Sequence, residues 1–361
     1  MKTLYIHVGM PKVGSTTLQT FFTKNQAQLE NQGIYYPTKG IYHQKIAHHV
    51  WAKSLKGPYF YYWWMNEDDP QYRIELIQAN LVKDITASSC SKVLLSAEDL
   101  WHLDVPKKLG NLFKGSQWSI KILAYLRRQD DALISAYNQC VKTPDPRMTN
   151  QEAMGNIESF VQTELQDPQS IFCLFPMLSR FAEVFGQENI IVRVLERDQL
   201  VDGDLLKDAL KVLGLSMEDS FEPVEDLNTS QPQSLIDILY LLNKRSNQPR
   251  DRHLKFNWRL RRIVQTMHLP DYPPLSPAMR RGIMDHFRED NAKVAKEFLG
   301  RADGQLFLNP EPDLNEEWTL PPEISAKTMA CAATHFWKAE QERLDELRTA
   351  RADLKERLQR L

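Results

Sequence analysis

The stretch "HVGMPKVGSTTLQTFF", residues 7–22, joins a short apolar run to a segment with helical spacing. The run that enters it, "TLYIHV" at 3–8, has the β-rich composition of a strand buried in a parallel sheet. Beyond the glycines, leucine and phenylalanine recur on one helix face from Leu18 to Leu29, and Gly33 ends the pattern. The stretch therefore predicts a strand, a tight loop and a helix.

Further apolar runs of the β type follow along the chain, each before a polar turn and a helical pattern. They are "KVLLS" (92–96), "IKILAYL" (120–126) and "NIIVRVL" (189–195). Strands that alternate with helices predict an α/β fold of three layers, with a central parallel sheet flanked by helices. With the glycine loop after the first strand, this is a P-loop-like arrangement. From about residue 205 onward the periodicity is helical.

The sequence divides at a proline-rich stretch. We expect one large domain over residues 1–308, a linker over 309–322 and a C-terminal helical tail over 323–361. Apolar residues in the tail follow a 3-4 spacing: Trp337, Leu344, Leu347, Leu354, Leu358 and Leu361. Glu340 and Arg351 interrupt this seam, so two interpretations stay open. The tail forms a homodimer through a coiled coil, or it lies on its own domain.

Composition narrows the class of protein only slightly. The 361 residues include 45 Lys plus Arg and 47 Asp plus Glu, which gives a net charge of −2. This charge identifies no partner, and we expect no nucleic-acid partner. No apolar run approaches the roughly 20 residues of a membrane span, and the first run resembles a strand rather than a signal peptide. The cysteines are widely spaced and predict reduced thiols in a cytoplasmic protein: Cys90, Cys140, Cys173 and Cys331.

The loop after the first run has its lysine in an unusual place. A Walker A loop reads G-x-x-x-x-G-K-[ST], whereas here Lys12 precedes Gly14. Gly14 lets backbone N–H groups approach a ligand, and Ser15, Thr16 and Thr17 add hydroxyls at the positive end of a helix. An ordinary turn would explain Gly14 and Ser15, but not the whole set. The pattern favours an anion site.

The segment "PKVGSTTLQ", residues 11–19, resembles the 5′-phosphosulfate loop of sulfotransferases that use 3′-phosphoadenosine 5′-phosphosulfate (PAPS). The pattern of that family is P-K-x-G-[ST]-[ST]-x-L. The resemblance implies that the loop holds the 5′-phosphate, while the lysine contacts the bridging oxygen and the sulfuryl group. The implied cofactor-binding residues are Lys12, Val13, Gly14, Ser15, Thr16 and Thr17.

The same family binds the 3′-phosphate with an arginine at a strand end and a serine eight residues later. "YLRRQDDALISAYNQCVK", residues 125–142, contains Arg127 and Ser135 at that spacing. Arg128 is the alternative to Arg127, because spacing alone sets the register. The resemblance extends more weakly over residues 3–308, where later segments look like bacterial carbohydrate-type members. It implies a carbohydrate or another small hydroxyl acceptor.

The acceptor hydroxyl needs a base within hydrogen-bond reach. Glu98 follows the run at 92–96, on the sheet edge where ligands of α/β proteins bind. The alternative is structural, with Ser96 and Asp99 starting a helix in the manner of a capping box. Histidines of "YHQKIAHHVW" are further candidates, with His49 ranked first: His43, His48 and His49.

Two other stretches can contact the acceptor. "PYFYYWWM", residues 58–65, has six aromatic residues, which can pack in a core or stack on sugars. "KRSNQPRDRHLKFNWRLRR", residues 244–262, has eight Lys or Arg and is either a solvated loop or a site for an anionic polymer or lipid headgroup.

The sequence therefore predicts a PAPS-dependent sulfotransferase whose chemistry needs no metal, with Lys12, Glu98 and His49 as catalytic candidates. A P-loop kinase or NTPase, in which Asp99 imitates a Walker B aspartate, is the first alternative. A nucleotide-fold module that serves only assembly is the second.

Overall fold

The computed structural model describes seven segments of the chain, and the structure below is that of these segments. They are residues 2–37, 74–142, 155–218, 220–224, 231–245, 269–319 and 326–359. The chain divides into two compact units. The sheet unit contains residues 1–133, 163–229 and 280–314, and the helical unit contains residues 134–162, 230–279 and 315–361.

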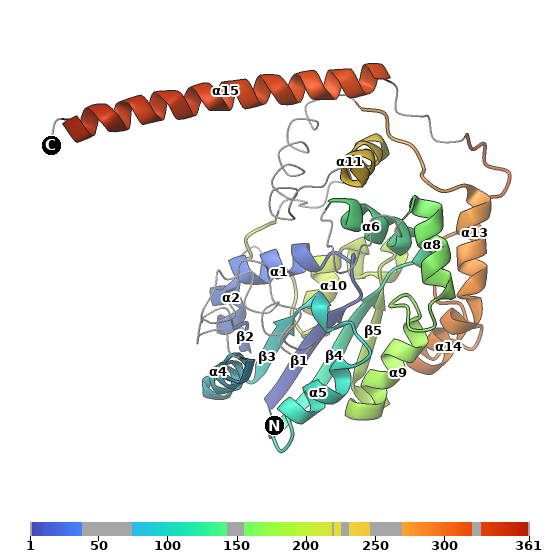
Figure 1. Ribbon diagram of the computed structural model, residues 1–361. Helices are drawn as coiled ribbons and strands as arrows, with labels where there is room; N and C mark the ends of the chain where they lie inside the picture. Colours follow the sequence, from blue (N-terminus) through green and yellow to red (C-terminus); the bar gives the residue numbers. More distant parts are fainter. Residues whose placement is uncertain are drawn as a thin grey trace. The chain divides into compact units, whose positions relative to one another are not determined.

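A five-stranded parallel sheet with strand order β2-β3-β1-β4-β5 forms the centre of the sheet unit (Figure 1). The strands are β1 (Lys2–Gly9), β2 (Ile34–Tyr35), β3 (Lys92–Ser96), β4 (Trp118–Leu126) and β5 (Ile190–Val194). His7 of β1 is in register with Ser96 of β3 and with Leu123 of β4. The carboxyl ends of the three inner strands therefore meet at one edge of the sheet.

The four strands expected from apolar runs are confirmed as β1, β3, β4 and β5. In β1, Leu4, Ile6 and Val8 are fully buried on one face, and His7 is buried on the other. The sequence did not predict β2, since a strand of two residues shows no periodicity.

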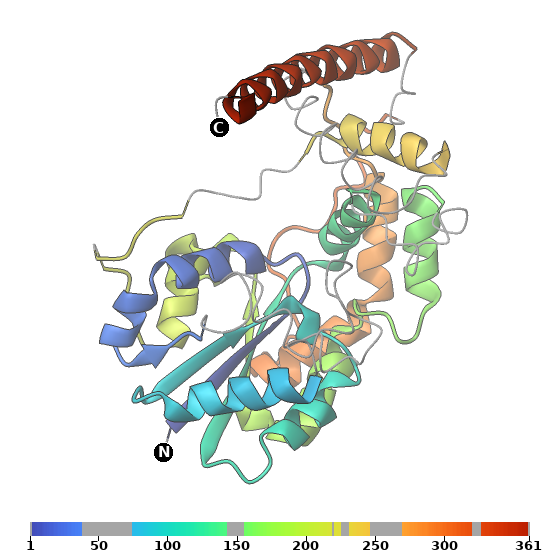
Figure 2. The same cartoon turned by 60° about the vertical axis from the view of Figure 1, so that its left-hand side comes forward.

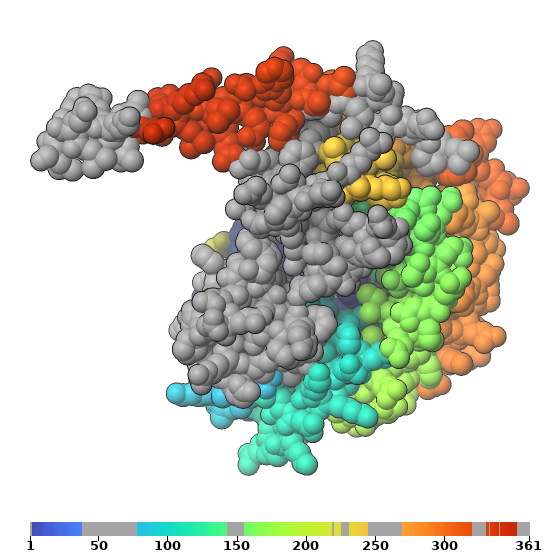
Figure 3. All heavy atoms as spheres, viewed as in Figure 1, coloured from blue at the N-terminus to red at the C-terminus, as the bar shows by residue number. Residues whose placement is uncertain are grey.

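Helices cover both faces of the sheet, so the three-layer α/β expectation is confirmed (Figures 1 and 2). On one face α9 packs against α5 and α14, and on the other α1 packs against α10. The side chains of α9 and α14 form one continuous surface (Figure 3). The helices of this unit are α1 (Ser15–Lys24), α2 (Gln26–Asn31), α4 (Ile74–Ala87), α5 (Val105–Leu112), α9 (Leu174–Phe185), α10 (Leu205–Val212) and α14 (Arg288–Leu299).

One expected helix is divided in the structure. The helix predicted from Leu18 to Gly33 breaks at Asn25, which is fully buried. The side-chain amide of Asn25 donates to the Phe21 and Glu222 carbonyls, and its oxygen accepts from the Glu222 N–H at 2.7 Å. This side chain therefore anchors a distant segment at the break, which local periodicity does not reveal.

The helical unit contains two complete helices among the described residues, α11 (Gln233–Arg245) and α15 (Ala326–Gln359). Tyr137 packs against Tyr240 at a ring distance of 6.4 Å, and Asn243 donates to the Val141 carbonyl at 2.7 Å. Three helices span the division between the units: α6 (Gln129–Lys142), α8 (Ile157–Gln166) and α13 (Pro277–His286). In the described part of the chain, no helix has the length and hydropathy to cross a membrane.

Candidate functional site

The loop between β1 and α1 has a tightly specified backbone. Gly9, Lys12 and Gly14 have φ of 100°, 71° and 84°, in the region that disfavours side chains. The Met10 N–H donates to the Tyr125 carbonyl at 3.0 Å, which ties the loop to β4. Val13 is fully buried, so only its backbone can face a ligand. These contacts with the core fix the position of the loop. Lys12 is half-buried.

Helix α1 begins at Ser15, and no side chain caps it. Ser15 is 3% exposed, and its buried hydroxyl has no hydrogen-bond partner among the described residues. A hydroxyl buried in this way costs about 1–3 kcal/mol. Thr16 is exposed and Thr17 is half-buried on the same turn. An anion at this helix end would satisfy the hydroxyl and the first N–H groups together.

Gly14 cannot be replaced without strain. A Cβ there would lie 2.6 Å from Leu205 Cδ2 of α10, and the left-handed backbone already favours glycine. Helix α10 therefore covers the loop closely on this side.

The two arginines after β4 have different contacts. Arg127 donates from its guanidinium to the Lys12 carbonyl at 3.1 Å, so it lies against the loop. Arg128 makes two hydrogen bonds to Asp130, at 3.1 and 2.7 Å, and a third to the Pro310 carbonyl at 2.8 Å. Asp130 is fully buried. Of the two, Arg127 is the arginine that the structure brings to the loop.

Ser135 lies in the second turn of α6 and is half-buried. It belongs to the helical unit, whereas Arg127 belongs to the sheet unit. The pairing of these two residues therefore stays a prediction.

Glu98 lies at the start of the loop. It begins a 3₁₀ turn, Glu98–Leu100, and a Cβ on Gly9 would lie 3.3 Å from its Cα and 3.5 Å from its Cβ. The residue before this turn is Ala97 rather than Ser96. Ser96 ends β3 instead, with its hydroxyl 2.8 Å from His7 Nδ1.

Three buried polar residues near the loop, His7, Ser96 and Gln19, form hydrogen bonds that the sequence did not predict. His7 and Ser96 pair across β1 and β3, and the Gln19 amide of α1 donates to the Ser96 carbonyl at 3.2 Å. Burial lowers the pKa of His7 to about 4, so the imidazole is neutral near pH 7. The signal in the sequence is a polar residue inside each apolar run.

A second buried cluster joins β4, β5 and α10. The Tyr125 hydroxyl donates to Asp208 at 2.7 Å, and Arg193 Nε donates to the same carboxylate at 2.9 Å. Burial, followed by the Asp208 charge, raises the pKa of Tyr125 above its ordinary value. Because Asp208 and Leu205 share α10, this cluster fixes the helix that covers Gly14.

Several predicted residues lie outside the described residues, namely His43, His48, His49, the aromatic stretch 58–65 and most of 244–262. Among the described residues, no group of three or more His, Cys, Asp or Glu side chains comes together to hold a metal ion. The four cysteines form no disulfide.

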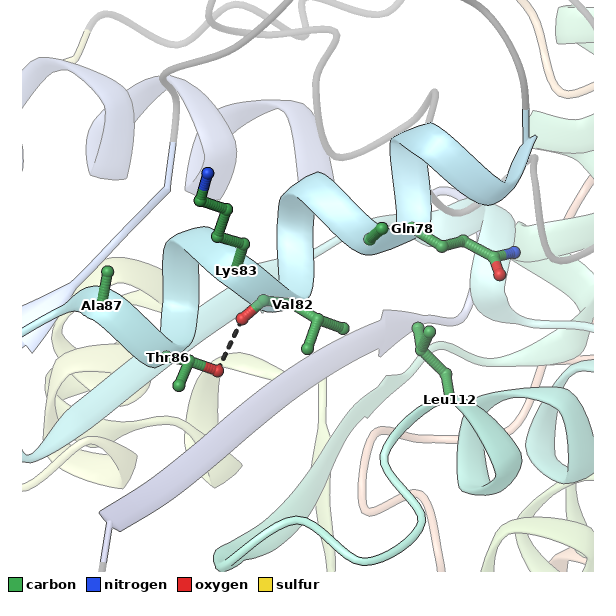
Figure 4. Close-up of a pocket in the computed structure, with 7 residues that line it drawn as sticks. Gln78, Val82, Lys83, Thr86, Ala87 and Leu112 are labelled. Carbon is green, nitrogen blue, oxygen red and sulfur yellow. Dashed lines mark hydrogen bonds between the residues drawn. The ribbon is translucent and has the colours of Figure 1, made fainter.

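An open concavity of about 730 Å³ lies elsewhere in the sheet unit, between α4 and the end of α5. Gln78, Val82, Lys83, Thr86 and Leu112 line it, and Thr86 donates to the Val82 carbonyl at 2.6 Å (Figure 4). None of the predicted site residues lines this concavity.

No protein-family model matches the chain. A protein of Archaeoglobus fulgidus, described as an uncharacterized protein, is 29% identical over 195 residues, which is 53% of this chain and 49% of that one. The chain thus spans about half the length of this curated relative.

Two solved structures were also found. One is a sulfotransferase from Alicyclobacillus acidocaldarius, with a TM-score of 0.37, 17% identity, and coverage of 71% of this chain and 95% of that one. The other belongs to the PezAT chromosomal toxin-antitoxin system of Streptococcus pneumoniae, with a TM-score of 0.27, 13% identity, and coverage of 74% and 88%. At these scores neither likeness supports an argument about function, and the fold is established by the sheet and its covering helices.

Proposed function

We propose that this protein is a sulfotransferase that moves a sulfuryl group from PAPS to a hydroxyl or amine, on a carbohydrate or glycoconjugate. The observation that carries the proposal is the loop at the end of β1. A lysine precedes its second glycine. A buried Ser15 hydroxyl, without a partner among the described residues, stands at the uncapped start of α1.

The described residues fit the 5′ end of such a donor. The backbone from Val13 to Thr17 and the Ser15 hydroxyl would hold its 5′-phosphate at the positive end of α1. When bound, the donor supplies an activated sulfuryl group. Lys12 brings a positive charge to the same loop, where it would stabilise the negative charge that develops on the leaving oxygen.

The contacts of the two arginines support Arg127 as the ligand of the 3′-phosphate. Arg128 is occupied by Asp130 and the Pro310 carbonyl, whereas Arg127 lies on the loop beside Lys12. A guanidinium is a forked and permanently charged donor, which suits a phosphate. Ser135 would add a hydroxyl from α6.

Glu98 is the proposed base for the acceptor. Its proximity to Gly9 places it at the start of the donor loop, where an acceptor hydroxyl would have to approach. As a carboxylate, Glu98 would accept the proton that the acceptor loses. His49, which lies outside the described residues, is the alternative base.

The direct test is transfer itself. The full chain is incubated with radiolabelled PAPS and a pool of mono- and oligosaccharides, and labelled products are separated from the donor. We expect label on a sugar fraction and equal formation of adenosine 3′,5′-bisphosphate, with EDTA present. A chain that instead uses ATP with magnesium is a kinase or NTPase, and a chain that binds neither nucleotide is an assembly module.

A further inference from the structure

Helix α15 has a row of apolar side chains, here called the seam, of which the largest are exposed. It is a single helix of 34 residues (Figure 1). Trp337, Leu344 and Leu347 are 66%, 43% and 53% exposed. Large apolar side chains repeated along one face are typical of an interaction surface. The seam consists of heptad positions a (Ala330, Trp337, Leu344, Arg351, Leu358) and d (Ala333, Glu340, Leu347, Leu354).

The two charged residues of the seam discriminate between the orientations of a helix pair. In a parallel pair, position a faces a and position d faces d. Arg351 would then face Arg351 of the second copy, and Glu340 would face Glu340. Like charges at a contact are destabilising. In an antiparallel pair, position a faces position d, so the two residues can face each other with opposite charges.

One antiparallel register satisfies the whole seam. When Arg351 is placed opposite Glu340 of the second copy, the remaining positions follow from the heptads. They pair Leu344 of each copy with Leu347 of the other. Two-fold symmetry makes each pair occur twice. Glu340 already lies 3.7 Å from Arg343 within the helix, so its carboxylate would be shared between two cations.

The residues beside the seam favour the same orientation. A parallel pair places Arg343, at position g, against Arg348, at position e, of the second copy. The antiparallel register instead places Arg348 beside Gln341 and Arg343 beside Ala350. It therefore brings no like charges together at these flanking positions.

We propose that α15 pairs with α15 of a second copy of this chain in an antiparallel two-stranded coiled coil, centred between Asp345 and Glu346. Each charged seam residue then meets its opposite, which explains why the seam is interrupted at these two positions. The inference concerns the tail alone and does not depend on the proposed activity.

A charge-exchange cycle on the full chain tests the proposal by sedimentation equilibrium. The wild-type chain is expected to be a dimer. Glu340→Arg and Arg351→Glu each place like charges opposite one another twice, so each should raise the dimer dissociation constant at least tenfold. The double variant restores opposite charges and should dimerise like wild type. The matched control Glu342→Arg changes a charge on the outer face and should leave the dimer intact.

A distance measurement reads the orientation independently. Cys331 is exposed on α15 and can carry a spin label in a chain whose other three cysteines are alanine. In the antiparallel register, the two labelled positions lie 29 residues apart along the pair, about 44 Å at 1.5 Å per residue. A parallel pair would bring them within about 20 Å, given helix axes 8–10 Å apart and two label arms.

Each other outcome overturns the proposal. A monomeric wild-type chain means that α15 lies on its own domain or serves another partner. If the wild type, both single seam variants and the double variant have equal dimer affinity, the pair is parallel. A short distance between the two labels means the same. Loss of dimer in the Glu342→Arg control means that the outer face, not the seam, makes the contact.

Discussion

The loop edge of the sheet unit and helix α15 of the helical unit differ in what each leaves unsatisfied. At the loop edge, the Ser15 hydroxyl at the start of α1 is buried and has no partner in the part of the chain that the structure describes. On α15, apolar side chains such as Trp337 are exposed. A buried hydroxyl at an uncapped helix start favours a hydrogen-bonding ligand, whereas an exposed apolar seam favours contact with another surface. The comparison separates the proposed anion site from the proposed helix-pairing surface.

The largest expected effect is at Lys12. Lys12→Ala should lower turnover by about 100-fold to 1000-fold, the loss seen when one preorganised charge-stabilising donor is removed. Binding of adenosine 3′,5′-bisphosphate should weaken only modestly, because this product lacks the sulfuryl group. Steady-state kinetics and calorimetry measure the two quantities. Equal losses in turnover and product affinity would make Lys12 an ordinary phosphate ligand.

The next effect is at Glu98. Glu98→Gln keeps the shape of the side chain but removes the proton acceptor, so turnover should fall roughly 100-fold, within the range for general-base catalysis. Nucleotide affinity should change little. The comparison variant is His49→Ala. Survival of activity in the glutamine variant, with loss in the alanine variant, assigns the base to His49.

A smaller effect separates the two arginines. Arg127→Ala should weaken adenosine 3′,5′-bisphosphate about tenfold or more relative to adenosine 5′-monophosphate, since a charge-assisted contact contributes about 1.5–3 kcal/mol. The matched control Arg128→Ala breaks its contacts to Asp130 and should lower the melting temperature without changing this ratio. Equal losses for both nucleotides in the Arg127 variant contradict the assignment to the 3′-phosphate.

The smallest effect is at the unpartnered hydroxyl. Ser15→Ala should leave the melting temperature of the ligand-free chain unchanged or higher, because it removes a buried group without a partner. Affinity for the bisphosphate should fall about 3-fold to 10-fold, as expected for one hydrogen bond of about 1 kcal/mol. Thr20→Val is the matched control, since the Thr20 hydroxyl is also buried and unpartnered among the described residues. It should leave affinity unchanged, and an equal loss there would remove the special role of Ser15.

The sequence predicted those parts of the fold that local pattern determines. Four strands were found because each is a short run rich in apolar residues of the β type, and the loop was found because Lys12 and Gly14 stand at a spacing that ordinary turns do not require. The break at Asn25 was missed because its partner, Glu222, is distant in the chain. The cluster of Tyr125, Asp208 and Arg193 was missed for the same reason, since Tyr125 and Asp208 are 83 residues apart.

The two arginines show where spacing stops being informative. Arg127 and Arg128 are adjacent at the end of β4, so either fits the motif within one residue. Their side-chain contacts differ, because Asp130 holds Arg128 while Arg127 reaches the Lys12 carbonyl. The assignment of Arg127 to a 3′-phosphate stays a prediction. Such a distinction depends on where each side chain points, which the strand pattern alone does not fix.

Calorimetric titration of the full chain with adenosine 3′,5′-bisphosphate, in EDTA, tests the central claim most directly. The loop, the helix end and Arg127 together predict one site per chain with a dissociation constant in the micromolar range. Adenosine 5′-monophosphate should bind at least tenfold more weakly, since it lacks the group that Arg127 would hold. A chain that ignores the bisphosphate and binds ATP only with magnesium would contradict the account.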